Sequence, residues 1–134
     1  MSGAIHHIDI TVGDLDCSTR FYDQVMPLMG FRRGLDVPEG PLWAGESCEV
    51  GLVAAHRDEP GKHNRFTPGL HHLAFAAPTR SSVEQLHAAL LTLGVHVLDA
   101  PAEYPRYAPG YFALFFADPD GIKLEYVHTP RWPA

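Results

Sequence analysis

The stretch His6-His7-Ile8-Asp9-Ile10-Thr11-Val12 decides the fold, because a similar stretch, His71-His72-Leu73-Ala74-Phe75-Ala76-Ala77, follows at an offset of 65 positions. Both stretches begin with a histidine pair and continue with apolar residues at every second position. This alternation is typical of a β-strand that presents one face to a hydrophobic core. The repetition indicates a chain built from two copies of one structural unit.

Each strand leads through a polar link into a segment with helical periodicity. Apolar residues recur at helical spacing over 21–29 and over 83–93, which predicts one helix in each half. Gly30 and Gly94 are the expected C-terminal stops, and Pro27 is expected to kink or break the first helix early. The candidate N-caps are Asp16 or Ser18 for the first helix and Ser81 or Ser82 for the second.

Three short strands are expected after each helix. A tight turn is predicted at Asp118-Pro119-Asp120-Gly121, between the last two. Each half therefore reads β-α-β-β-β, which predicts a single α+β domain over 1–134, with modules at 1–56 and 69–134 and a linker at 57–68. The predicted strands after the helices are 32–35, 42–44 and 49–55 in the first half, and 96–100, 111–117 and 123–128 in the second.

Composition excludes several classes of function. The chain has 134 residues, 46% of them hydrophobic, and a net charge of −6. It has no basic run, which argues against a nucleic acid or an anionic membrane as its partner. We expect a cytoplasmic protein for three reasons. Its two cysteines lie outside any metal-ligand spacing, its N-terminal residues do not form a secretory signal, and no apolar run has the length needed to span a membrane.

Strand alternation places three possible metal ligands on one side of the sheets. His7 and His72 face away from the apolar residues of their strands, and Glu125 does the same in the last strand. Two imidazoles and one carboxylate match a facial triad with open positions, suited to Fe, Mn, Zn or Ni. Packed or hydrogen-bonded histidines and a solvated glutamate are the alternative reading.

Three motifs carry a family resemblance: the first strand followed by Phe21-Tyr22, the His-His-Leu-Ala-Phe start of the second half, and Phe-x-Asp-Pro-Asp-Gly-x-x-Leu-Glu at 116–125. The chain resembles the vicinal oxygen chelate superfamily, which includes glyoxalase I, extradiol dioxygenases and bleomycin-resistance proteins. The resemblance implies curved mixed sheets around a central cleft that holds a divalent metal, and a homodimer. His7, His72 and Glu125 match the family's ligand positions.

One position departs from the glyoxalase I pattern. That pattern has a second glutamate in the last strand of the first module, where this chain has Gly51. Glu49 lies two residues away on the same face and would need a register shift or bulge to reach the metal. The departure argues against strict glyoxalase I activity.

The stretch from Glu103 to Phe112 is the least generic part of the chain, with three tyrosines and an arginine between prolines and glycines. It could line a pocket for an aromatic or oxygen-rich ligand, or pack on a dimer partner. Trp43 could close the other wall or belong to the core. The candidate pocket residues are Trp43, Tyr104, Arg106, Tyr111 and Lys123, and the candidate general bases are Asp9, Glu49 and Tyr107.

Two functions fit these residues. The first is a metal-dependent lyase, isomerase or dioxygenase, in which the ion binds vicinal oxygens of a small oxygenated substrate. The second is a non-catalytic protein of the bleomycin-resistance type that sequesters an aromatic small molecule. The intact set of His7, His72 and Glu125 favours the first.

Overall fold

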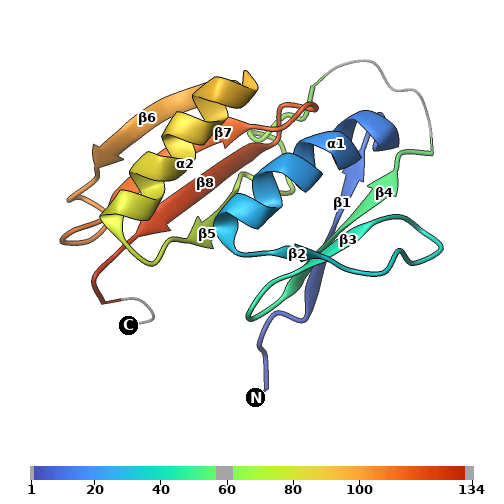
Figure 1. The fold of residues 1–134 in the computed structure, drawn as a ribbon, viewed down its shortest axis with the longest axis horizontal. Coiled ribbons are helices and arrows are strands. Elements are labelled where there is room, and N and C mark those ends of the chain that lie inside the picture. The colour runs from blue at the N-terminus through green and yellow to red at the C-terminus, as the bar shows by residue number, and fades with distance from the viewer. Residues whose placement is uncertain (1, 57–61, 132–134) are drawn as a thin grey trace. The chain divides into compact units, whose positions relative to one another are not determined.

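The computed structural model describes residues 2–56 and 62–131, which fall into two compact units (Figure 1). The units are Met1–Gly61 and Lys62–Ala134. Of the predicted linker, residues 57–61 lie outside the described part of the chain. Residues 62 and 63 are tied to the second unit: Lys62 Nζ donates to the Pro119 carbonyl at 2.7 Å, and the His63 amide donates to the Asp120 carbonyl at 2.8 Å.

The first unit is a mixed sheet with one α-helix. Its strands run in the spatial order β1-β4-β3-β2, with β1 parallel to β4 and the other pairs antiparallel. The predicted break at Pro27 is confirmed, because the α-helix gives way there to a short 3₁₀ helix. The elements are β1 (His7–Val12), α1 (Leu15–Val25), η1 (Met26–Met29), β2 (Arg32–Arg33), β3 (Leu42–Ala44) and β4 (Glu49–Ala54).

The second unit repeats this topology. Its strand order is β5-β8-β7-β6, with β5 parallel to β8 and the other pairs antiparallel. The predicted β-α-β-β-β repeat and the α+β class are therefore confirmed. The elements are β5 (Leu73–Ala76), α2 (Arg80–Leu93), β6 (Val97–Glu103), β7 (Phe112–Ala117) and β8 (Lys123–His128).

In each unit the core lies between the helix and one face of the sheet, as Figure 1 shows for α2 across β7 and β8. The buried positions alternate along β1 as predicted. The other face of each sheet carries the predicted metal ligands. The core includes the fully or almost fully buried residues Val12, Tyr22, Val25, Met26, Trp43, Val50 and Leu52 in the first unit, and Val83, Leu90, Ala113, Leu114, Phe116 and Leu124 in the second.

Both predicted N-caps are wrong by a few positions. Asp14, in extended conformation, caps α1 by accepting from the Cys17 amide at 3.0 Å. Thr79 caps α2 by accepting from the Ser82 amide at 3.0 Å. Several adjacent residues could cap either helix, and the end of the preceding strand decides which one does. The C-terminal stops are confirmed, since Gly30 and Gly94 adopt left-handed φ values of 88° and 73°.

Strand β6 extends three residues beyond its predicted end and is irregular. Its pairing with β7 shifts register between Val97 and Asp99 and again between Asp99 and Ala102. Pro101 lies in the second of these gaps, on the edge strand of the sheet, where a missing backbone N–H is tolerated. Within the described residues, neither α1 nor α2 has the length and apolar character needed to cross a membrane.

Candidate metal centre

Glu125 is a carboxylate buried in the second unit with a partner for each oxygen. Strand β8 pairs it with Ala74 on one side and Phe115 on the other, and only 1% of its surface is exposed. Its Oε1 atom lies 2.9 Å from Nε2 of His72, and its Oε2 atom accepts a hydrogen bond from the Tyr111 hydroxyl. A buried carboxylate is costly unless it is paired in this way.

The His72–Glu125 pair fits a divalent ion by its donor types and spacing. Two ligand atoms that each lie about 2.1 Å from one ion are separated by about 3 to 4 Å, depending on the angle at the metal. The observed 2.9 Å is close to the lower limit. Without a metal, the same spacing is that of a charge-assisted hydrogen bond.

Aromatic side chains form a wall beside this pair. Tyr104 and Tyr107 stack with their centroids 5.6 Å apart, and Tyr104 meets the Phe115 ring edge-on at 5.6 Å. The Phe115 ring lies 6.2 Å from that of His72, and Lys123 places its ammonium 4.5 Å from the Phe115 centroid. The wall therefore adjoins the two candidate ligands directly.

Two of the tyrosines at this place, Tyr104 and Tyr111, are held in their neutral form by a raised pKa. Burial raises the pKa of the Tyr111 hydroxyl well above its ordinary value of 10.0, and the hydrogen bond to Glu125 raises it further. Burial also raises the pKa of Tyr104. Arg106 lies at the exposed end, where its Nη2 donates to the Tyr107 hydroxyl at 3.1 Å. The structure thus groups four predicted pocket or base residues: Tyr104, Arg106, Tyr107 and Tyr111.

The first histidine of each pair orients the second, a role that the sequence reasoning missed. Nδ1 of His71 lies 2.7 Å from Nδ1 of His72, and Nδ1 of His6 lies 2.9 Å from Nδ1 of His7. In each pair one nitrogen donates and the other accepts. Nε2 of the second histidine is left to face a carboxylate, as expected for a ligand oriented through its other nitrogen. The duplicated His-His sequence was the available signal.

In the first unit, His7 has a carboxylate neighbour on its own strand. Its Nε2 atom lies 3.8 Å from Oδ2 of Asp9, and both side chains are more than half exposed. The β1–β4 ladder is regular and pairs His7 with Glu49 and Asp9 with Gly51. Gly51 therefore occupies the register position of Glu125, as predicted, and no bulge moves Glu49 toward it.

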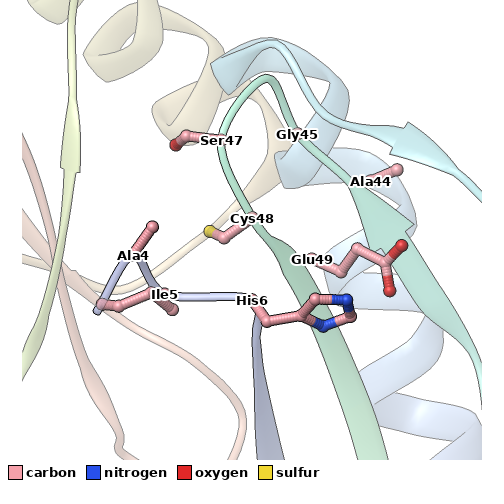
Figure 2. A pocket seen from close by; sticks show the side chains of 8 residues that line it. All are labelled: Ala4, Ile5, His6, Ala44, Gly45, Ser47, Cys48 and Glu49. Atoms are coloured by element: carbon pink, nitrogen blue, oxygen red, sulfur yellow. The ribbon is translucent and has the colours of Figure 1, made fainter. Parts of the chain in front are cut away.

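Glu49 lines an open pocket of about 400 Å³ in the first unit. Figure 2 shows the side chains of Glu49 and His6 among those that line the pocket, while the Cys48 thiol points toward Ala4. The candidate base thus lines the same pocket as the histidine that contacts His7. The pocket is lined by Ala4, Ile5, His6, Ala44, Gly45, Ser47, Cys48 and Glu49.

Trp43, one of the predicted pocket residues, is instead a core residue. It is completely buried, it packs against Tyr22 at a centroid distance of 5.8 Å, and its indole N–H donates to Asp23 at 3.0 Å. Trp43 and Val50, which are paired in the β3–β4 ladder, both lie on the face of the sheet that packs against the helix. The pocket-wall assignment is wrong because alternation in this three-residue strand turns Trp43 toward α1.

The complete three-residue metal site remains a prediction. His7 belongs to the first unit, whereas His72 and Glu125 belong to the second. Among the residues that the structure describes, no group of three or more histidine, cysteine, aspartate and glutamate side chains is arranged to hold a metal ion. The donor pair in the second unit is the part that the geometry supports.

Residues 4–126 match the family model of the Glyoxalase/Bleomycin resistance protein/Dioxygenase superfamily. A curated relative, the uncharacterized protein YqjT of Bacillus subtilis (strain 168), is 33% identical over 96 residues, covering 70% of this chain and 74% of YqjT.

Solved structures resemble the chain over almost its full length. A protein of Bacillus halodurans with a provisional glyoxalase assignment is 28% identical, with a TM-score of 0.80 over 96% of this chain and 97% of that one. Lactoylglutathione lyase from Agrobacterium tumefaciens is 20% identical, with a TM-score of 0.72 over 98% of each chain. At that identity, the second likeness concerns the fold alone.

Proposed function

The chain belongs to the glyoxalase/bleomycin resistance protein/dioxygenase superfamily, and from this premise we propose that it is a metal-dependent enzyme acting on a small oxygenated molecule. The reaction would be that of a lyase or isomerase, or that of a dioxygenase. The observation that carries the proposal is the 2.9 Å approach of His72 Nε2 to Oε1 of the buried Glu125. His7, on the equivalent strand of the other unit, would complete the ligand set for Fe, Mn, Zn or Ni.

When bound, the ion would act as a Lewis acid toward vicinal oxygen atoms of the substrate. The residues of the chain would orient the ligands and bind the substrate. Tyr111 fixes the Glu125 carboxylate, and His71 and His6 orient the two imidazoles. The wall of Tyr104, Tyr107 and Phe115 would exclude water and contact an apolar or aromatic part of the substrate.

The candidate bases differ in their surroundings. Asp9 is exposed beside His7, Glu49 lines the pocket next to His6, and Tyr107 is 55% exposed at the edge of the aromatic wall. A carboxylate suits proton abstraction near neutral pH better than a tyrosine, whose ordinary pKa is about 10. Glu49, the carboxylate that lines the pocket, is therefore the preferred candidate.

One observation favours a second function, the sequestration of an aromatic small molecule without catalysis. Aromatic rings gather at one end of the second unit, with Lys123 and Arg106 beside them. Such a surface could stack on a planar ligand with no metal present. Either function is proposed for a cytoplasmic homodimer, the state that the sequence and the family resemblance suggest.

Elemental analysis of the purified, untagged protein separates these functions. We expect one transition metal per chain in the wild type, lost in His72→Ala and Glu125→Gln and kept in His96→Ala, which removes an exposed imidazole from the same unit. Absence of metal from the wild type after incubation with each of the four ions would contradict the enzyme proposal. Binding of an aromatic ligand with an affinity that a chelator does not change would then support sequestration.

A further inference from the structure

The two units place their carboxylates on different strands of equivalent strand pairs. In the second unit, the parallel register pairs Ala74 of β5 with Glu125 of β8. In the first unit, the corresponding pair is Asp9 of β1 with Gly51 of β4. Each pair thus holds one acidic residue and one alanine or glycine. The acidic residue is on β8 in the second unit and on β1 in the first.

The Asp9 carboxylate lies over the position where Gly51 has no side chain. A Cβ atom built on Gly51 would be 2.6 Å from Oδ1 of Asp9, far closer than such atoms approach one another. The other nearby group, the Pro41 carbonyl oxygen, would be at an ordinary contact distance of 3.6 Å. Asp9 therefore fills the space that a side chain at position 51 would enter.

His7 and Asp9 repeat the donor arrangement of the second unit. In both units, Nδ1 of the second histidine is engaged by the first, and Nε2 faces a carboxylate oxygen. The His7–Asp9 separation of 3.8 Å is too long for a hydrogen bond but lies within the range of about 3 to 4 Å expected for two ligands of one ion. Because Nε2 of His7 and Oδ2 of Asp9 are not hydrogen-bonded to each other, both atoms could bind the same ion.

We propose that Asp9 is a metal ligand beside His7, supplying from β1 the carboxylate that Gly51 does not supply from β4. The inference rests on the proposed function, because it concerns the ion that His7 would bind. The first unit then offers one imidazole and one carboxylate, as His72 and Glu125 do in the second, and an added carboxylate favours harder ions such as Mn(II) or Fe(II). Gly51 then no longer means that the first unit lacks a carboxylate ligand.

The test exchanges the carboxylate between strands and measures cobalt(II) affinity by calorimetry and by the visible absorption of the bound ion. Asp9→Ala should weaken binding at least about tenfold. The double variant Asp9→Ala/Gly51→Glu recreates the Ala74–Glu125 arrangement, and removal of the aspartate leaves room for its new Cβ. It should recover most of the lost affinity and the wild-type spectrum. Thr11→Ala, on the same face of β1, is the matched control.

The outcomes distinguish this inference from the proposed function. Asp9→Ala with wild-type affinity, beside a Glu125→Gln variant that has lost it, would overturn the role of Asp9 and leave the three-ligand site standing. A double variant no better than Asp9→Ala would also count against it. A general base would show a different pattern, with cobalt affinity unchanged and kcat reduced. Failure of the wild type to bind cobalt would overturn both.

Discussion

The hydroxyl of Tyr111 donates a hydrogen bond to Oε2 of Glu125 and so fixes a carboxylate that is almost completely buried. Because Oε2 is occupied in this way, Oε1 is the oxygen turned toward His72, 2.9 Å from its Nε2 atom. Tyr111 precedes β7 and lies on the side of the sheet away from α2, as Phe115 and Glu125 do. The tyrosine therefore controls how the candidate ligand is presented.

Replacement of Tyr111 by phenylalanine should destabilise the protein by about 1 to 3 kcal/mol, because it leaves a buried carboxylate oxygen without its donor. Tyr107→Phe is the matched control, since that hydroxyl is at the exposed end of the wall beside Arg106. The control should change the free energy of unfolding by less than about 0.5 kcal/mol. Urea denaturation at neutral pH measures both. Equal losses in the two variants would contradict the importance of the Glu125 contact.

The raised pKa of Tyr111 predicts a loss of stability at alkaline pH. Above the ordinary pKa of 10.0, the tyrosine of the unfolded chain releases its proton, whereas the folded protein, where burial and Glu125 raise the pKa, retains it. Folding then binds a proton, so the free energy of unfolding falls as the pH rises. This contribution is fully present below pH 10 and is absent from Tyr111→Phe, which should therefore lose stability less steeply. Urea titrations from about pH 8 to 11 measure the slope for the wild type and for Tyr111→Phe, and equal slopes in the two proteins would contradict the prediction.

Much of the fold could be predicted because the chain repeats a strand whose two faces differ. Alternation placed Ile10 and Val12 in the core and His7 on the other side, as the structure shows. The equivalence of Gly51 and Glu125 followed from the same alignment, and the register of the two parallel pairs agrees with it.

Other features depend on contacts that no single segment encodes. The orientation of Trp43 depends on a three-residue strand too short to show a period. The position of Asp9 over Gly51 depends on the pairing of strands 42 positions apart. The contact between the paired histidines depends on ring rotation, which sequence spacing does not determine. That His7, His72 and Glu125 bind one ion remains a prediction, because His7 belongs to one unit and the other two residues belong to the other.

The start of α1 can be tested by removing its cap. Asp14 accepts from the Cys17 amide, so Asp14→Ala should lower the free energy of unfolding by about 1 kcal/mol. Asp16→Ala removes a carboxylate from the first turn that does not cap and should cost at most a few tenths of a kcal/mol through the helix dipole. A larger loss for Asp16→Ala than for Asp14→Ala would place the cap where the sequence first suggested it.

Metal binding should stabilise the folded protein, because the ligands come together only in the native state. At a free cobalt(II) concentration about 100 times the Kd, the expected gain is about 2.7 kcal/mol. The gain should vanish in His72→Ala and on addition of a chelator, and it should persist in Thr11→Ala. Thermal unfolding with and without cobalt measures it. Equal stabilisation of His72→Ala would indicate that cobalt binds at other histidines of the chain.

The turn before β8 should affect both stability and metal binding, because it sets the strand that carries Glu125. Oδ1 of the buried Asp118 accepts from the amides of Asp120 at 2.9 Å and Ile122 at 2.8 Å. Asp118→Ala leaves both amides without this acceptor and should cost about 2 kcal/mol in urea denaturation, with faster hydrogen exchange at Ile122. Asp118→Asn keeps an oxygen acceptor and should lose less than half as much. If Asn were as damaging as Ala, the negative charge rather than the acceptor would hold the turn.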